Sequence, residues 1–321
     1  MKILVTGGAG YIGSFMVKRL LDEGNEVVVA DSLERGHREK VDSRAIFEQG
    51  NLLDKSFIEL LFSKYKFDAV MHFAAYIAVG ESMQDPGMYF RNNVFTTINL
   101  LDAMVANRTK YFIFSSTGTV YGTPKIIPTP ESHEKNPENP YSESKLMVEK
   151  ILRWYFDVKG VGFAVLRYFN AAGGALDGTL GENHVPETHL IPLAIKAAIE
   201  GSEFNMFGDD WETKDGTAVR DYIHVLDLID AHILTLKKLQ EENGAYTYNV
   251  GTGMGSSIKE VLEMIKKISG KDILVATKER REGDVAETVA DTSKIKNELG
   301  FSPKYSDLET IIKTAWQWHN K

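Results

Sequence analysis

Two side chains that can move a proton lie four residues apart in the segment PYSESKLMVEK. Tyr141 and Lys145 have the spacing that places both side chains on one face of a helix. A phenol with its ordinary pKa near 10 is a poor base, but a positive charge ~4 Å away, at an effective dielectric of about 20, lowers that pKa by up to about three units. In most proteins such a pair belongs to a solvated surface. Because a phosphate-binding glycine pattern precedes it in this chain, we interpret Tyr141 as a general base assisted by Lys145.

A third hydroxyl group is expected where the segment FSSTGTVYG (114–122) leaves a buried strand. Ligands bind at the carboxyl ends of strands in sheets of this class. We expect Thr117 to hydrogen-bond the reacting hydroxyl, because Ser115 and Ser116 lie closer to the strand. The alternative is that all three hydroxyls satisfy backbone groups at the strand end.

The glycine pattern is TGGAGYIG (6–13), between the first strand and the first helix. Gly7 permits a tight turn, Gly10 lets the backbone approach a pyrophosphate, and Gly13 lets the helix pack closely on the sheet. The pyrophosphate would meet the amide groups at the helix N-terminus. The pattern therefore predicts a dinucleotide site.

An acidic residue at the end of the second strand indicates which dinucleotide. Asp31 lies 18 positions beyond Gly13, where a carboxylate accepts hydrogen bonds from the adenosine ribose and repels a 2′-phosphate. We therefore expect NAD rather than NADP. Arg35 and Arg38 could bind that phosphate, but we interpret them as solvated loop charges.

The elements that position these residues alternate along the first half of the chain. Apolar runs predict strands at 2–6, 26–31, 45–49, 68–74, 110–116 and 162–168. Helical patterns lie after Gly10 and near 55–65, 86–107, 142–159, 190–200, 225–241, 257–269 and 307–318. Buried strands alternating with helices predict an α/β fold with a doubly wound parallel sheet. We expect a cofactor domain at 1–168 and a substrate domain at 169–321, with segments near 220–250 returning to the first.

Composition narrows the function. The net charge of −8 argues against sequence-independent nucleic-acid binding, and the absence of cysteine excludes disulfides and thiolate chemistry. The N-terminus lacks the long apolar run of a signal peptide, and no apolar stretch is long enough to span a membrane. We expect a cytoplasmic protein with no nucleic-acid or membrane partner.

A series of motifs resembles the UDP-glucose 4-epimerases of the extended short-chain dehydrogenase/reductase family along nearly the whole chain. In order they are TGGAGYIG, HFAA, VGES, NN at 92–93, FSSTGTVYG, YSESK, RYFN, HLIP, DGTAVRDYIHV and RREGD. The resemblance implies a Rossmann domain followed by a smaller nucleotide-sugar domain, a homodimer, and tightly bound NAD. It implies that Tyr141 removes a proton from the sugar 4-hydroxyl while carbon 4 is oxidised, and that the 4-keto sugar turns over and is reduced on its other face, which regenerates NAD in each cycle.

The resemblance also assigns binding residues. Those expected at NAD are Gly7, Gly10, Tyr11, Ile12, Gly13, Asp31, Asn51, Leu52, Phe73, Ala74, Asn92, Ser115, Tyr141, Lys145 and Tyr168. Those expected at the UDP-sugar are Thr117, Tyr141, Asn170, His189, Leu190, Phe207, Arg220, Tyr222, Arg281, Asp284 and Thr288. Arg220 and Arg281 match diphosphate ligands, since a guanidinium presents a rigid fork of donors. Leu190 and Phe207 match uracil contacts, with ordinary core positions as the alternative.

Several positions depart from the family pattern. Asn51 replaces an Asp that contacts adenine, Ile77 replaces a Lys that contacts ribose, and Thr117 replaces the usual Ser. His189 replaces an Asn; together with His184 it suggests a metal pair, but no pattern supplies a third ligand, and we expect no metal. Thr288 replaces a Tyr that excludes a large carbon 2 substituent, so we expect turnover of N-acetylated UDP-sugars as well.

Three other functions compete with an epimerase. A 4,6-dehydratase would carry Asp-Glu after Thr117, where this chain has Gly118 and Thr119. A decarboxylase would need additional donors for a uronic carboxylate, and no motif supplies them. A non-catalytic sensor of NAD or nucleotide sugar would have lost Tyr141 and Lys145.

Overall fold

A computed structural model of the chain describes residues 1–281 and 283–321 and separates into two compact units. The first comprises Met1–Gly122, Lys135–Arg167 and Ala231–Tyr248, and the second comprises Thr123–Glu134, Tyr168–Asp230 and Asn249–Lys321. The sequence pattern places a change near residue 169 and a return near 220–250. It does not indicate that residues 123–134 belong with the second unit.

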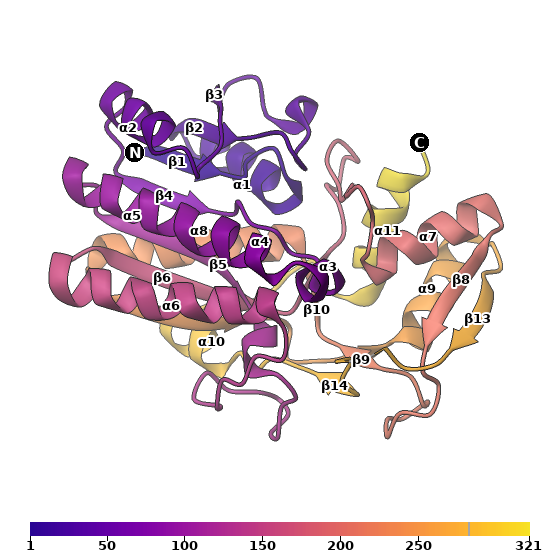
Figure 1. Cartoon of the computed structure of the whole chain (residues 1–321). Coiled ribbons are helices and arrows are strands. Elements are labelled where there is room, and N and C mark those ends of the chain that lie inside the picture. Colours follow the sequence, from indigo (N-terminus) through magenta and orange to yellow (C-terminus); the bar gives the residue numbers. More distant parts are fainter. Residues whose placement is uncertain (282) are drawn as a thin grey trace. The chain divides into compact units, whose positions relative to one another are not determined.

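Seven strands form the central sheet in the order β11-β6-β5-β4-β1-β2-β3 (Figure 1). They are β1 (Lys2–Thr6), β2 (Glu26–Asp31), β3 (Ile46–Gln49), β4 (Ala69–His72), β5 (Tyr111–Thr117), β6 (Gly162–Tyr168) and β11 (Ala245–Val250). The pairs β1–β2, β1–β4, β2–β3 and β4–β5 are parallel, so the carboxyl ends of these five strands meet at one edge. The predicted strands are confirmed with small shifts at their ends, whereas β11 was not predicted.

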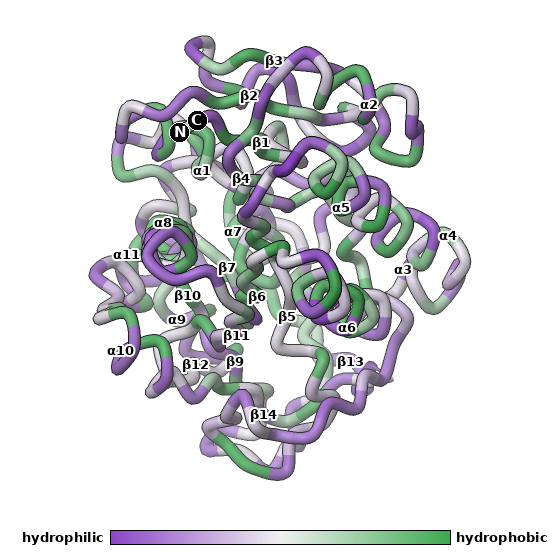
Figure 2. Tube along the Cα trace, turned by 90° about the vertical axis from the view of Figure 1, so that its left-hand side faces the viewer, coloured by the Kyte–Doolittle hydropathy of each residue, from purple (hydrophilic) through white to green (hydrophobic). Residues whose placement is uncertain are grey.

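Helices flank this sheet, as expected for a doubly wound Rossmann-type fold. Those of the first unit are α1 (Tyr11–Asp22), α2 (Lys55–Lys64), α3 (Val79–Gln84), α4 (Pro86–Phe90), α5 (Thr96–Asn107), α6 (Pro140–Lys159) and most of α8 (Val225–Glu241), with short 3₁₀ turns at Arg38–Lys40 and Gly118–Tyr121. Helices α2, α5 and α6 follow one another across the sheet (Figure 1), and α1 packs on β1 and β2. Figure 2 shows hydrophobic residues along β4 and β6, whose side chains are buried almost throughout.

The helix expected over 86–107 is interrupted. A π-helical turn at Arg91–Phe95 separates α4 from α5. Asn93 in this turn accepts the Tyr76 N–H at 2.9 Å and donates to the Ser144 hydroxyl of α6 at 3.0 Å. Such turns are frequent at functional sites, and this one ties the segment after β4 to α6.

The second unit has short strands around a helical core. Its helices are α7 (Leu190–Glu200), α9 (Ile258–Ser269), α10 (Ser293–Leu299) and α11 (Leu308–His319). Its strands are β7 (Asn170–Ala172) beside β10 (Tyr222–His224), β9 (Val219–Arg220) between β12 (Ser256–Ser257) and β14 (Glu287–Thr288), and β8 (Glu203–Phe207) beside β13 (Leu274–Lys278). Apolar side chains of α7, α9 and α11 form its core. Among the described residues, no helix is both long and apolar enough to cross a membrane.

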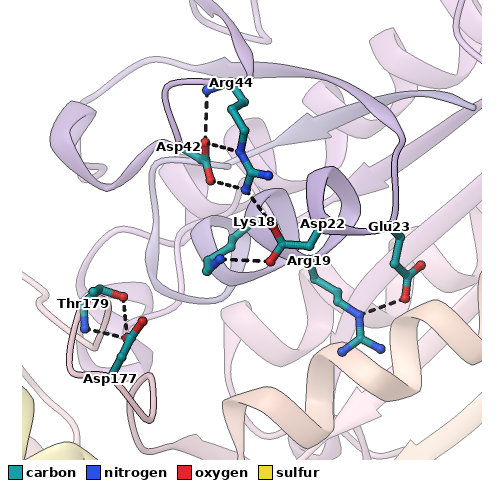
Figure 3. A network of polar contacts seen from close by, with 8 residues as sticks. All are labelled: Lys18, Arg19, Asp22, Glu23, Asp42, Arg44, Asp177 and Thr179. Atoms are coloured by element: carbon teal, nitrogen blue, oxygen red, sulfur yellow. Dashed lines mark hydrogen bonds and ion pairs between the residues drawn. The ribbon is translucent and has the colours of Figure 1, made fainter.

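Exposed charges are paired at the surface of the first unit (Figure 3). Lys18 contacts Asp22 at 2.9 Å, and the Arg44 guanidinium reaches Asp22 and Asp42, each at 2.7 Å. Exposed pairs of this kind contribute little to stability, because solvent screens them in both the folded and the unfolded chain.

Candidate active site

The predicted base lies in the first turn of α6. Asn139 caps the helix by accepting the Ser142 N–H at 2.9 Å, and Pro140 occupies a position that needs no backbone donor. Tyr141 follows directly and is half-buried. Lys145, one turn later, is buried, and its Nζ donates to the Ser115 carbonyl at the end of β5 at 2.9 Å. The helix and the strand therefore bring together the side chains that the sequence predicts.

Burial dominates the electrostatics of this pair. It raises the pKa of Tyr141 to about 12, against a hydrogen bond with Thr117 that favours the anion. Burial also lowers the pKa of Lys145 to about 7, against the attraction of Glu149. The predicted lowering of the tyrosine pKa by Lys145 is not found in the protein alone, where burial sets the direction. To act as the predicted base, Tyr141 needs further positive charge beside it.

Thr117 lies within a chain of hydroxyl groups. Its Oγ1 is 2.9 Å from that of Thr119, and the Ser142 hydroxyl donates to Thr119 at 2.7 Å. Thr117 is also hydrogen-bonded to Tyr141, and the Ser142 hydroxyl lies 2.9 Å from Asn139 Oδ1, so the chain of hydroxyls links the helix cap to the predicted base. Sequence reasoning missed Thr119 and Ser142, although Ser142 is adjacent to the predicted base.

A second buried group supports Lys145. Glu149, one helical turn beyond it on the same face, accepts from Arg167 Nε at 3.0 Å and from the Ser116 hydroxyl at 2.6 Å. Arg167 also donates to the Tyr121 hydroxyl at 2.8 Å. The regular spacing of Tyr141, Lys145 and Glu149 was a signal that the sequence contained and that the motif-based reasoning did not use.

The glycine loop has the shape that a dinucleotide requires. Gly7 has φ +72°, and a Cβ there would lie 2.5 Å from the Ala74 backbone nitrogen; a Cβ at Gly13 would lie 2.1 Å from the Gly7 oxygen. At Gly10 it would meet only that oxygen, at 3.2 Å, so its other side is open to a ligand. The first turn of α1 holds no acidic side chain, which leaves its N-terminal amides for an anion.

Asp31 is anchored beside this loop. Its carboxylate accepts the N–H groups of Ala9 at 3.0 Å and Leu33 at 2.9 Å, and each oxygen keeps a lone pair for a ribose hydroxyl. Arg35 is paired with Glu81 at 2.7 Å, and Arg38 lies 4.4 Å from the centre of the Phe47 ring. Both arginines are thus engaged within the protein. These residues fit NAD better than a cofactor with a 2′-phosphate.

The remaining predicted cofactor residues of the first unit lie on α1, on the π-helical turn, or at the carboxyl ends of β3, β4 and β5. Tyr11, Leu52 and Ser115 are buried, Ile12, Phe73, Ala74 and Asn92 are half-buried, and Asn51 is exposed. Asn51 accepts the Leu53 N–H at 2.8 Å, which orients its amide. Ile77 is exposed, with 39% of its surface accessible.

In the second unit, two adjoining ladders carry predicted substrate residues. Arg220 pairs with Thr288 across β9 and β14, and Asn170 pairs with Tyr222 across β7 and β10. Burial lowers the pKa of Arg220 and raises that of Tyr222 to about 12. Within the described part of the chain, Arg220 has no carboxylate at ion-pair distance, although Asp284 attracts it from further away, and it donates to the Val219 carbonyl at 2.9 Å. A half-buried guanidinium in this state is suited to an anionic ligand.

A second group gathers around Arg281. Its guanidinium lies 4.5 Å from the centre of the Phe207 ring, and its Nε donates to Asp284 at 3.0 Å.

The other predicted residues lie on separate elements. Leu190 begins α7 directly after His189, and Tyr168 ends β6. Glu282, the remaining residue of the RREGD motif, lies outside the described residues.

Two carboxylates accompany His184 and His189, although no pattern in the sequence supplied a further ligand. Glu182 and Glu187 lie against both imidazoles. Burial favours the neutral form of Glu182, yet His189 and His184 lower its pKa to about 2. Burial likewise opposes charging of His184, but Glu182 and Glu187 raise its pKa to about 9. The loop that joins these residues has no periodic pattern, so their proximity was not visible in the sequence.

Comparison with known proteins agrees with this arrangement. A match to the "NAD dependent epimerase/dehydratase family" spans residues 3–251. The chain is 49% identical over 320 residues to a UDP-glucose 4-epimerase of Lactobacillus helveticus, covering 99% of this chain and 97% of that protein. Among solved structures, it is similar to a UDP-glucose 4-epimerase of Brucella ovis in complex with NAD (TM-score 0.96, 45% identity, 99% and 98% of the two chains) and to a UDP-Glc/GlcNAc 4-epimerase of Campylobacter jejuni (0.87, 42%, 99% of both). The chain therefore belongs to the NAD dependent epimerase/dehydratase family and, within it, to the UDP-glucose 4-epimerases.

Proposed function

We propose that this protein interconverts UDP-galactose and UDP-glucose by NAD-dependent oxidation and reduction at sugar carbon 4. The observation that carries the proposal is the joint placement of Tyr141, Lys145 and Thr117 at the carboxyl end of β5, beside the strand ends that hold the glycine loop and Asp31. The relatives with this activity match the chain along almost its full length.

In the proposed mechanism, NAD would accept a hydride in its oxidised form and return it in its reduced form, and its oxidised ring would add a positive charge. Tyr141 removes the proton of the 4-hydroxyl, with Thr117 hydrogen-bonded to the Tyr141 oxygen. Lys145, held by the Ser115 carbonyl, orients the nicotinamide ribose and adds charge. After the 4-keto sugar has turned to present its other face, Tyr141 returns the proton to the new hydroxyl. Each cycle leaves the cofactor as it began.

We further propose that residues 1–168 bind NAD and residues 169–321 bind the UDP-sugar, with the segment near 220–250 shared. Arg220 and Arg281 bind the diphosphate, and Asn170 and Tyr222 donate nearby. Leu190 and Phe207 contact uracil, Asp284 contacts its ribose, and His189 lies at the nucleotide. Two observations support this assignment. The Arg220 guanidinium makes no ion pair in the part of the chain that the structure describes, and Arg220 pairs with Thr288 in the ladder.

One observation on this chain and one on a relative extend the proposal to substrate breadth. Thr288 lies beside Arg220 in the ladder, so a small side chain there leaves space next to the diphosphate for an acetamide at sugar carbon 2. One solved relative is named a UDP-Glc/GlcNAc 4-epimerase. We infer that this chain also interconverts UDP-GlcNAc and UDP-GalNAc, and that Thr288→Tyr removes this second activity while leaving the first.

The protein is further proposed to be a cytoplasmic homodimer. Trp154 and Val158 lie one turn apart on α6 and are 68% and 65% exposed, as expected for an apolar strip covered by a second copy. Light scattering on a size-exclusion column should give twice the chain mass, and the mass should fall for Trp154→Glu.

The deciding experiment is incubation of the purified protein with UDP-galactose, without added cofactor, followed by separation of the nucleotide sugars. UDP-glucose is expected, and denatured protein should release NAD or NADH rather than NADP. A 4-keto-6-deoxy sugar would indicate a dehydratase. Bound nucleotide sugar without conversion, even with added NAD, would indicate a sensor and would contradict the proposal.

A further inference from the structure

A cluster of four potential ligands lies in the second unit, between β7 and α7. One ligand atom each from Glu182, His184, Glu187 and His189 lies within 4.8 Å of the others. His184 Nδ1 is 3.2 Å from a Glu182 oxygen and 3.7 Å from a Glu187 oxygen, and His189 Nδ1 is 3.9 Å from the same Glu187 oxygen. His189 Nδ1 also contacts Glu182 directly. Two imidazoles and two carboxylates therefore point at one centre.

These separations are close to those of a tetrahedral ion site. Bonds of about 2.0–2.1 Å to nitrogen and oxygen place the ligands of a tetrahedral Zn²⁺ roughly 3.3–3.4 Å apart. The nitrogen–oxygen distances measured at His184 lie on either side of that value. His189 Nδ1 departs further from it, at 3.9 Å from Glu187 and in direct contact with Glu182, so an ion requires side-chain shifts of about 1 Å within this loop.

The segment that carries the cluster is held from outside. A Cβ at Gly181 would lie 2.2 Å from the Trp318 ring, so only glycine lets this ring pack on the loop. The Trp318 indole then donates to the Glu182 carbonyl at 2.8 Å. Glu187 accepts the N–H groups of Thr188 at 2.8 Å and His189 at 2.9 Å, which fixes its carboxylate. Backbone and indole contacts thus orient ligands before an ion arrives.

Charge and access also fit a cation. The Glu182 side chain is only 5% exposed, and a buried carboxylate needs a positive partner. A divalent ion with two neutral imidazoles neutralises both carboxylates. A surface pocket of about 600 Å³, lined by His184 and Glu187 together with Lys196 and His319, provides an entry path. His189 begins α7 without using its side chain as a cap, and its Nδ1 faces the Glu182 carboxylate instead.

We propose that Glu182, His184, Glu187 and His189 bind a divalent transition-metal ion, in the first instance Zn²⁺. Imidazole nitrogen with carboxylate oxygen favours Zn²⁺ over Mg²⁺ or Ca²⁺, which take oxygen ligands. Four protein ligands leave no open position, so the site is structural and fastens the loop over 181–189 to the start of α7. The proposal does not depend on the reaction assigned to the first unit.

The test is Zn²⁺ binding by wild-type protein that carries no polyhistidine tag and has been stripped with a chelator. Equilibrium dialysis should give one Zn²⁺ per chain with a dissociation constant of about 1 µM or lower, unaffected by excess Mg²⁺. Co²⁺ used as a probe should develop the visible absorption of a four-coordinate ion. Zn²⁺ should also raise the unfolding midpoint.

Variants assign the site. His184→Gln and Glu187→Gln should each weaken Zn²⁺ binding at least about tenfold, with circular dichroism showing that both fold. His37→Gln is the matched control, because the His37 imidazole also faces a carboxylate, that of Glu39 at 3.7 Å, but His37 does not belong to the four-residue cluster. Absence of tight Zn²⁺ binding by the wild type would overturn the proposal and leave an ion-pair cluster. Equal loss in His37→Gln, or full affinity in His184→Gln, would overturn it as well.

Discussion

In the first unit, the proposed catalytic groups lie on two long elements, β5 and the 20-residue helix α6. In the second unit, the proposed diphosphate ligands lie on strands of two residues and on loops. Tyr141 and Lys145 are therefore controlled by burial, which favours the neutral form of each. Arg281 is 58% exposed and is held by a neighbouring carboxylate and ring. One unit tunes proton affinity, and the other presents permanent charge.

The same contrast separates chemistry from binding. A group that must change protonation benefits from a low-dielectric setting, where a cofactor charge has a large effect. A group that must hold a diphosphate needs to stay charged and adjustable. Variants in the two units should therefore affect different quantities: turnover and core stability in the first, and ligand affinity in the second.

The largest effect is expected for Tyr141→Phe. Removal of the proton acceptor should lower kcat at least about 100-fold, the range of general base catalysis. Binding of UDP and retention of NAD should persist, because the ring and the helix remain. Steady-state rates and calorimetric titration with UDP measure the two parts. A decrease in kcat of less than tenfold would refute the assignment of the base.

Arg167→Met should also have a large effect on the first unit, but on its free energy of unfolding rather than on kcat. It leaves Glu149 buried without its cation, at a cost of about 3–5 kcal/mol in the free energy of unfolding. Arg44→Met is the control, since Arg44 pairs with two carboxylates but at the surface (Figure 3), and the resulting change in the free energy of unfolding should lie within error. Urea denaturation compares them, and equal losses would refute the role assigned to burial.

The comparison also explains what the sequence predicts. In the first unit, strands such as β1 and β5 are buried on both faces, so each appears as an unbroken apolar run. The glycine loop and the Tyr141–Lys145 pair follow such strands at short distances along the chain. Local patterns therefore predict most of this sheet and its three catalytic candidates.

In the second unit, the information is not local. Strands of two or three residues, such as β9 and β14, are too short for periodicity, and β13 is exposed at four of its five residues. β8 alternates between exposed and buried residues, but over only five positions. The Glu182 carbonyl accepts from Trp318, which lies 136 positions further along the chain. Arg220 and Arg281 were assigned through motifs of a known family, and neither periodicity nor charge patterning would have found them.

Arg220→Met and Arg281→Met should separate the two kinds of cation within the second unit. Arg220 is half-buried without an ion-pair partner in the part of the chain that the structure describes, so its loss should weaken UDP binding about 30-fold, or ~2 kcal/mol. Arg281 is exposed, and its loss should weaken binding less than about tenfold. Titration calorimetry at two salt concentrations measures both. The reverse order would contradict the assignment.

The smallest effect is expected for Lys145→Met in cofactor-free protein, and this variant should gain stability where the others lose turnover, stability or affinity. Burial lowers the pKa of Lys145 to about 7, whereas in the unfolded chain it is about 10.4. Below about pH 7 both states carry the charge, so folding bears the full cost of burying it; between the two values the unfolded state binds more protons, so wild-type stability rises with pH. The variant should therefore be more stable near neutral pH, and its advantage should vanish as the pH approaches ~10.

The size of that gain is limited. The difference of about 3.4 pK units sets an upper bound of about 5 kcal/mol, and loss of the 2.9 Å hydrogen bond to Ser115 together with the attraction of Glu149 reduces it to about 1–2 kcal/mol. Urea denaturation of wild type and variant at several pH values measures the difference. Lys150→Met, at an exposed position on the same helix, is the control and should leave the pH dependence unchanged, because that side chain is solvated in both states. If the variant were less stable than the wild type at every pH, burial of the Lys145 charge would not lower the free energy of unfolding. Lys145 would then stabilise the first unit, and the prediction would be wrong.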